Sequence, residues 1–203
     1  RQRQMCIRDS LKKAGYNVTT TPIQASGPLY ASVSQDSDSF HASGIFPSTD
    51  KSFYNKFKSN LTVCDKKNLV DNVKVGLAVP KYEQVIDSIS DLNSKKSITS
   101  SNTGNSSNSF GKSVDWTIQG TDARNGVMKQ TKSELDDGQL DKYSLKESSD
   151  QDQFKTIQKA YKQQKPIVFT AMEPSWFSKE LDIKMLKDPE KIYGKDDEHI
   201  NLV

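Results

Sequence analysis

Short apolar runs typical of β-strands alternate along this chain with segments in which apolar residues recur at helical spacing. The clearest strand patterns are residues 73–79 and 167–170. Phe53, Phe57 and Leu61 follow one another at intervals of four and therefore share one face of a helix. Strands that alternate with helices indicate an α/β protein with buried, largely parallel sheets.

Further elements are expected from the same patterns and from turn and capping signals. Ser149 and Asp152 form a capping box at the start of a helix, and Thr49 or Asp50 can cap the helix that contains Phe53. The remaining predicted strands are 18–23, 40–46, 114–118, 143–145 and 199–203, and the remaining predicted helices are 11–16, 27–33, 85–92, 126–135 and 173–181. A stretch rich in Ser, Asn and Lys, 93–109, is expected to be an exposed loop.

Charge and composition exclude several classes of protein. The chain has 29 Lys and Arg residues against 26 Asp and Glu residues, a net charge of +3. This near balance gives no electrostatic basis for coating a nucleic acid or an anionic membrane surface. Apolar residues make up 33% of the chain, and no apolar run approaches the length of a membrane-spanning helix. These features indicate a globular protein with a very polar surface.

Both ends of the sequence have unusual features. Residues 1–10 resemble the translated end sequence of a sequencing-library transposase adaptor, and we exclude them from fold reasoning; the alternative is a natural basic N-terminus. Without Cys6, Cys64 is the sole cysteine, so neither an intrachain disulfide nor a cysteine metal site is expected. The chain stops at Val203, within a strand-like alternation, and we expect a fragment truncated at both ends.

No constellation of catalytic residues is apparent. The two histidines, His41 and His199, lie far apart in the sequence, and no metalloprotease, serine-hydrolase or Cys-His pattern occurs. Residues 111–113 match the end of a phosphate-binding loop, but position 106 is Ser106 rather than Gly and no strand precedes it. The sequence therefore predicts neither an enzyme nor a cofactor.

Two groups of carboxylates could be taken for metal ligands. They are Asp136-Asp137 and Asp196-Asp197-Glu198. Solvated loop charge is the simpler interpretation of both, so no metal site is expected.

Six short motifs occur in a fixed order from Leu11 to the end of the chain. They are Leu11–Val18, Gly27–Ala31, Val75–Tyr82, Gly120–Asp122 with Gly126–Met128, Lys165–Thr170 with Pro174 and Trp176, and Met185–Glu190 with Gly194 and Glu198–Ile200. In this order they resemble the substrate-binding proteins of glycine betaine/proline betaine (osmoprotectant) ABC transporters.

The resemblance implies a two-lobed α/β fold of the periplasmic-binding-protein type (type II), in which hinge closure traps a ligand between lobes. Lobe I is expected to comprise 11–82 and 171–203, and lobe II 83–170, including the loop 93–109. The implied partners are a betaine-like solute and an ABC transporter permease, with no nucleic acid. The implied location is the outer face of the cell membrane, through a missing lipid anchor or a fused permease.

The ligand site of the family combines a helix N-terminus with an aromatic cage. The helix N-terminus binds the ligand carboxylate through backbone N–H groups, and the resemblance assigns this role to Gly126 and Val127. A tight turn with a structural glycine is the alternative interpretation of this motif. The cage holds a quaternary ammonium against tryptophan faces.

The aromatic cage is poorly matched in this sequence. Ile45 and Met172 occupy positions where the family has Trp, Asp50 occupies the position of a His, Phe46 is adjacent, and Trp176 matches. Three interpretations remain open: Phe46 and Trp176 replace the cage walls, Asp50 pairs directly with the cation of a different solute, or ligand binding has been lost. Phe46 and Met172 could also be core residues, and Trp116 is expected to pack rather than bind.

Two functions of other classes compete with the transport receptor. One is an enzyme that binds a phosphorylated substrate at the Gly120–Gly126 turn, and the other is a surface module that binds no solute. The candidate ligand-binding residues are Ile45, Phe46, Asp50, Gly126, Val127, Met172 and Trp176.

Overall fold

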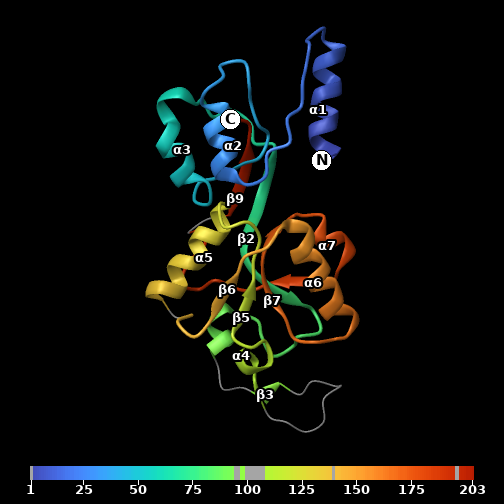
Figure 1. Cartoon of the computed structure of the whole chain (residues 1–203), viewed down its shortest axis with the longest axis vertical. Coiled ribbons are helices and arrows are strands. Elements are labelled where there is room, and N and C mark those ends of the chain that lie inside the picture. The colour runs from blue at the N-terminus through green and yellow to red at the C-terminus, as the bar shows by residue number, and fades with distance from the viewer. Residues whose placement is uncertain (1, 94–96, 99–107, 139, 195–196) are drawn as a thin grey trace.

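The computed structural model describes residues 2–93, 97–98, 108–138, 140–194 and 197–203 (Figure 1). Its α-helices are α1 (Gln2–Lys13), α2 (Ser26–Val33), α3 (Lys51–Phe57), α4 (Phe110–Ser113), α5 (Gly126–Asp137), α6 (Asp150–Lys162) and α7 (Phe177–Glu180), with 3₁₀ turns η1 (Lys58–Asn60) and η2 (Ile89–Asn93). Its strands are β1 (Gly44–Phe46), β2 (Val70–Pro80), β3 (Ser97–Ile98), β4 (Asn108–Ser109), β5 (Thr117–Gln119), β6 (Ser144–Lys146), β7 (Val168–Glu173), β8 (Ile183–Met185) and β9 (Glu198–Asn201).

One mixed sheet joins most of the strands, and the long strand β2 links its two parts. The strand order is β1-β9-β2-β7-β5-β6, and β8 also pairs with β2. The first residues of β2 pair with β9, whereas Lys74–Pro80 pair with β7 and β8. The expectation of largely parallel sheets is wrong, because β2 runs antiparallel to all three neighbours and, among the described strands, only the pairs β5–β6 and β5–β7 are parallel. The parallel pairs are those joined through the helical crossovers α5 and α6.

The helices form two bodies around this sheet, as expected of a two-lobed fold (Figure 1). In the smaller body, α2 and α3 bury one cluster against the chain end, namely Tyr30, Val33, Phe53, Leu61 and Val203. In the larger body, one cluster includes Leu77, Ile118 and Val168, and a second includes Ala78, Ile157, Phe169, Phe177 and Ile183. Alternating residues of β2 and β7 thus face two cores, which is the pattern of a sheet covered on both sides.

The packing clusters do not coincide with the expected lobe limits. Phe177, Leu181 and Ile183 fall in the range assigned to lobe I, but they pack with Ile157 of α6 in the larger body. Leu77 likewise packs with the larger body. The clusters differ from the expected lobes because β2 passes from one body to the other, so that its second part and the strands paired with it belong to the larger body.

Several local predictions were wrong in extent or type. Residues 18–23 form no strand and pair with no strand among the described residues. The expected helix 85–92 is reduced to η2, with Val85 36% exposed outside it. The expected helix 173–181 is reduced to α7, because Glu173 still belongs to β7. Most of the expected loop 93–109 lies outside the described residues.

Other local predictions are confirmed. Phe53 and Leu61 are buried in one cluster with Phe57 packed against it, although α3 ends at Phe57 and Leu61 lies in extended backbone after η1. The Ser149 hydroxyl accepts a hydrogen bond from the Asp152 N–H at 3.1 Å, which caps α6. Trp116 packs edge-on against Tyr143 with ring centroids 5.2 Å apart. Within the described part of the chain, no helix is both long and apolar enough to cross a membrane.

Candidate functional site

The N-terminus of α5 meets a loop of the smaller body, residues 47–50, at the junction between the two bodies. A Cβ atom at Gly126 would overlap the Thr49 carbonyl oxygen and lie 2.7 Å from the Thr49 methyl group. Only glycine therefore permits this approach. The N–H groups of Gly126 and Val127 have no hydrogen-bond partner among the described residues, and the positive end of the helix dipole lies at the buried contact with Thr49.

Asp50 is a buried carboxylate next to this contact, with 1% of its surface exposed. Its Oδ2 accepts hydrogen bonds from the Ile45 N–H at 3.0 Å and the Tyr30 hydroxyl at 3.4 Å. Its Oδ1 is buried and has no partner among the described residues. Burial raises the pKa of Asp50 to about 6, against the opposing effect of the Ile45 N–H. Asp50 precedes α3, but its side chain faces Tyr30 and Ile45 and does not cap the helix.

Glu198 is a second buried carboxylate, with 2% of its surface exposed, and it binds the other end of the same loop. Its two oxygens accept hydrogen bonds from the Ser48 N–H at 3.0 and 3.2 Å and from the Thr49 N–H at 3.3 and 3.4 Å. Burial raises the pKa of Glu198, and these N–H groups act in the opposite direction. The expectation that Glu198 is solvated loop charge is therefore wrong.

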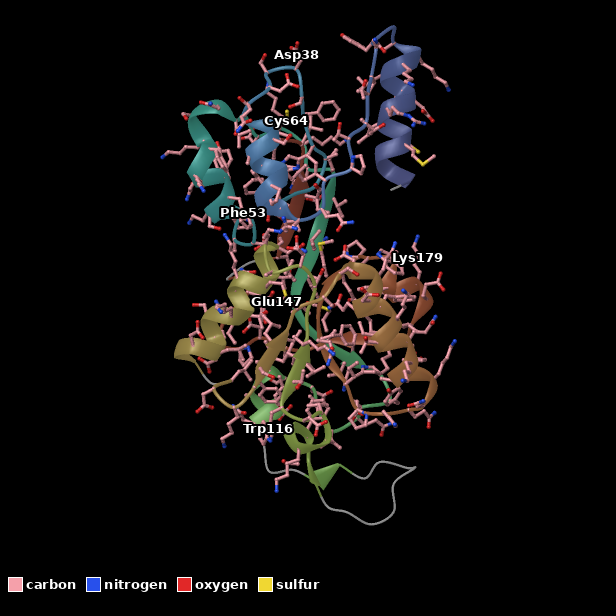
Figure 2. The ribbon with its side chains drawn as sticks, in the orientation of Figure 1. Asp38, Phe53, Cys64, Trp116, Glu147 and Lys179 are labelled. Atoms are coloured by element: carbon pink, nitrogen blue, oxygen red, sulfur yellow. The ribbon has the colours of Figure 1, made fainter. Side chains whose placement is uncertain are left out.

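The turn before α5 makes direct contacts with the N-terminus of α2. The Ser26 N–H donates to the Asn125 Oδ1 at 3.2 Å, and the Gly27 N–H donates to the Arg124 carbonyl oxygen at 3.3 Å. One turn further along α5, the Lys129 ammonium lies 3.9 Å from the centroid of the Phe53 ring. Figure 2 shows Phe53 on the side of α3 that faces α5. The two bodies are thus in contact along α5.

Three of the candidate residues are brought together at this junction. Gly126 contacts Thr49, the residue before Asp50, and Asp50 accepts from the backbone of Ile45. Val127 follows Gly126, but its side chain packs against the core of the larger body.

The aromatic and thioether candidates lie elsewhere. Phe46 packs edge-on against Tyr54 at 5.7 Å and lies, partly buried, against the core of the smaller body. Met172 is half-buried in β7, opposite Val75 of β2. Trp176 is 52% exposed and lies against Phe154, at 4.5 Å, and Phe177. Among the described residues, no ring contact joins Phe46 to Trp176.

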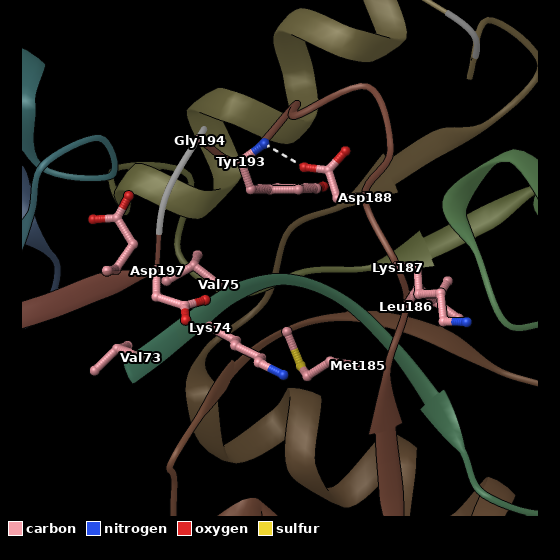
Figure 3. Close-up of a pocket in the computed structure, with 11 residues that line it drawn as sticks. Val73, Lys74, Val75, Met185, Leu186, Lys187, Asp188, Tyr193, Gly194 and Asp197 are labelled. Atoms are coloured by element: carbon pink, nitrogen blue, oxygen red, sulfur yellow. Dashed lines mark hydrogen bonds between the residues drawn. The ribbon is translucent and has the colours of Figure 1, made fainter. Parts of the chain in front are cut away.

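A separate cavity of about 360 Å³ opens beside β2, between β8 and β9 (Figure 3). Its lining includes Val75, Lys74, Tyr193 and Glu198. The Tyr193 N–H donates to Asp188 at 2.8 Å, and the Tyr193 hydroxyl lies 2.8 Å from the Thr131 hydroxyl of α5. Among the described residues, no group of His, Cys, Asp and Glu side chains has the arrangement of a metal site.

Comparison with known families identifies the fold. The family model for the substrate binding domain of the ABC-type glycine betaine transport system matches residues 6–203. The chain belongs to this family. The resemblance found in the sequence motifs is thereby confirmed, and the match includes residues 6–10 of the segment expected to be foreign.

Individual relatives of this betaine-system domain agree with the assignment. The glycine betaine/carnitine transport binding protein GbuC of Listeria monocytogenes serotype 1/2a (strain 10403S) is 38% identical over 87 residues, 42% of this chain and 29% of GbuC. The crystal structure of lactococcal OpuAC in its closed-liganded conformation with glycine betaine superposes with a TM-score of 0.77 at 26% identity, over 95% of this chain and 67% of OpuAC. The glycine/betaine/L-proline-binding protein ProX of Borrelia burgdorferi superposes with a TM-score of 0.78 at 25% identity, over 97% of this chain and 68% of ProX. The chain thus spans less than a third of the curated relative and about two thirds of these solved structures.

Sequence reasoning on this betaine-system domain missed several residues of the junction. The sequence predicts Glu198 to be a solvated charge in a loop, although the residue belongs to one of the family motifs. That motif is the signal that could have marked it as a residue of the junction. Tyr30 also stands in a motif, and its hydroxyl reaches Asp50. Asn125 and Lys129 had no sequence signal, because their partners on α2 and α3 are more than 70 residues away.

Proposed function

We propose that the chain is the solute-binding part of an ABC importer and holds a small betaine-like solute between its two bodies. The observation that carries this proposal is the approach of Gly126 at the start of α5 to Thr49, beside the buried Asp50. Family membership supports it, as do relatives described as binding glycine betaine and carnitine.

The junction offers complementary partners for the two ends of a zwitterion. The N–H groups of Gly126 and Val127 would receive the solute carboxylate, where the helix dipole favours an anion. The Asp50 carboxylate, whose Oδ1 has no hydrogen-bond partner in the described part of the chain, would attract the cationic end. Closure of the bodies would exclude water and strengthen both interactions.

The replacement of two family tryptophans should change which solute is bound more than how it is bound. Ile45 and Met172 provide no aromatic face, and Phe46 is packed in the core of the smaller body. Trp176 retains an exposed ring face that could contact a methylated ammonium. We therefore propose a cationic or zwitterionic solute recognised by charge from Asp50, with Trp176 as the candidate aromatic contact.

Partners and location follow from the same proposal. The family consists of solute-binding receptors of ABC importers, which act outside the cytoplasm. For this chain we propose delivery of the solute to a permease, through a lipid anchor or a permease fusion, and no catalytic activity.

Isothermal titration with glycine betaine, proline betaine, carnitine and choline tests the proposal. We expect saturable binding by the wild type. Gly126→Asp places a negative charge and a Cβ against Thr49, so affinity should fall by at least about tenfold. Ser133→Asp adds the same charge at an exposed position of the same helix and should leave binding unchanged.

Two outcomes would contradict the proposal. A folded wild type that binds no solute of the panel would favour the surface module without solute binding. Equal affinity of the wild type and the Gly126→Asp variant would remove the helix N-terminus from the site. Circular dichroism of the wild type and of both variants controls for a folding defect.

A further inference from the structure

Glu198 lies where the shared strand passes from one body to the other. It begins β9 and pairs with Val73 of β2. The register of β2 against β9 shifts between Val70 and Val73, and Asn72 within this bulge has a φ of 56°. Beyond this point β2 pairs with β7 in the larger body. Glu198 is therefore anchored at the strand connection about which the two bodies are joined (Figure 1).

The carboxylate of Glu198 binds the backbone of the loop 47–50. Both oxygens accept from the N–H groups of Ser48 and Thr49, and no ion pair involves Glu198 among the described residues. Gly194 packs tightly against the same contact. A Cβ there would lie 2.7 Å from the Ser48 hydroxyl oxygen and 3.3 Å from the Glu198 Oε1. Two parts of the chain that lie 150 residues apart, at Ser48 and at Glu198, thus meet at one side chain.

The loop that Glu198 holds carries the contact with α5. Ser48 and Thr49 receive the Glu198 carboxylate, Thr49 touches Gly126, and the next residue is Asp50. Moving these two N–H groups would move the Thr49 carbonyl and the Asp50 carboxylate relative to the N-terminus of α5.

We propose that Glu198 is a positioning residue that fixes the loop 47–50 against α5 and thereby sets the solute affinity of the junction. The effect on solute affinity, the second half of this inference, rests on the proposed function. Its first half, the ordering of the loop, concerns the ligand-free protein alone.

A carboxylate is specifically suited to this role. Two N–H donors converge on two acceptor oxygens, and bonds from N–H groups to a charged acceptor are stronger than those between neutral groups. In Glu198→Gln, one acceptor becomes an NH₂ group that faces N–H donors. The buried amide then leaves donors unsatisfied, and the loop loses part of its anchor.

Amide hydrogen exchange and calorimetry on the same variants test both halves. In ligand-free Glu198→Gln, we expect the Ser48 and Thr49 amides to exchange at least about tenfold faster than in the wild type, with other amides unchanged. The dissociation constant for the tightest solute of the panel should rise about tenfold. Glu190→Gln makes the same chemical change at an exposed position and should alter neither quantity.

The possible failures are distinguishable. Unchanged exchange at Ser48 and Thr49, or faster exchange spread over the whole chain, would overturn the positioning role. Faster local exchange with unchanged affinity would overturn the link between the loop and the solute. A wild type that binds no solute would overturn the proposed function and, with it, the affinity half of this inference.

If Glu198→Gln does not fold, Glu198→Asp replaces it. The shorter side chain keeps the charge but withdraws the carboxylate from the loop. We expect the same local increase in exchange, and wild-type exchange in this variant would contradict the inference.

Discussion

Two buried titratable side chains of the smaller body have pKa values shifted in opposite senses. Burial raises the pKa of Asp50 to about 6 and lowers the pKa of His41 to about 4. Tyr30 lies between them, with its hydroxyl bonded to Asp50 and its ring 4.7 Å from the His41 ring. In both cases the neutral form is favoured, because a charge would be poorly solvated there. Their effects on acid stability oppose each other, so each must be isolated by a variant.

The Asp50→Asn variant isolates the first effect. An acid whose folded pKa is raised contributes stability below its unfolded pKa, about 4, and loses this contribution as the pH rises through about 6. At pH 7.5 we therefore expect Asp50→Asn to exceed the wild type in free energy of unfolding, by up to about 3 kcal/mol. The difference should shrink as the pH falls to 4. Urea unfolding from pH 4 to 8 measures it.

The matched control for this prediction is Asp38→Asn, at an exposed aspartate of the same body (Figure 2). It should show no such pH-dependent gain. A stability difference for Asp50→Asn that stays constant from pH 4 to 8 would show that folding does not raise the pKa of Asp50.

Helix α6 provides a prediction about a single element. The Ser149 hydroxyl accepts from the Asp152 N–H, one of the N–H groups that the first turn of a helix leaves without a partner. Ser149→Ala should therefore lower the free energy of unfolding by about 1 kcal/mol. Ser133→Ala, at an exposed position inside α5, should change it far less. Equal losses in the two variants would indicate that the cap contributes nothing to stability.

Elements set by neighbouring residues were predictable from the sequence. The Phe53 helix and the Ser149 cap depend on spacings of three and four residues, and both are present. The strand expected at 18–23 has the right alternation, but a strand exists only with a partner, and none of the described strands lies beside it. The antiparallel pairing of β2 with β7, β8 and β9 could not be predicted for the same reason, because the path of the whole chain decides which strands become neighbours.

The candidate site was predictable only where a motif marks it. The ligand-binding role of Gly126 is predicted from a family motif, with a structural glycine as the alternative, and the structure shows its close contact with Thr49. Glu198 was misread because its partner Ser48 lies 150 residues away and nothing local distinguishes a buried glutamate from a solvated one. The sequence predicts Asp50 both as a site candidate and as a possible cap of the Phe53 helix. Only the fold shows that its carboxylate accepts from Tyr30 and Ile45 instead of capping α3.

At the scale of the whole molecule, the two bodies are held together by the protein's own contacts as well as by any solute. Ser26 and Gly27 of α2 donate to the turn before α5, Thr49 packs on Gly126, and Lys129 lies over Phe53. A solute shifts the balance between open and closed forms only by its preference for the closed one. Under the proposed function, contacts made without the solute therefore set how much of its binding energy is needed for closure.

Lys129→Gln tests this coupling between closure and affinity. The ammonium lies 3.9 Å from the Phe53 centroid, a distance at which a cation is attracted by the ring face. Removing the charge should favour the open form, so the radius of gyration of the ligand-free protein in X-ray scattering should increase. Solute affinity should fall by about two- to fivefold, the value of one exposed cation–π contact.

Lys132→Gln removes an equal charge from an exposed position of α5 and should leave both quantities at their wild-type values. Because solute binding adds its own stabilisation to the closed form, the scattering curves of Lys129→Gln and wild type should converge when the solute is saturating. Curves that differ equally with and without solute would mean that Lys129 changes the shape of the bodies rather than the balance between their arrangements. Identical curves and affinities in all three proteins would mean that the Lys129–Phe53 contact contributes nothing to closure, and that the backbone contacts of α2 and Thr49 hold the bodies together without it.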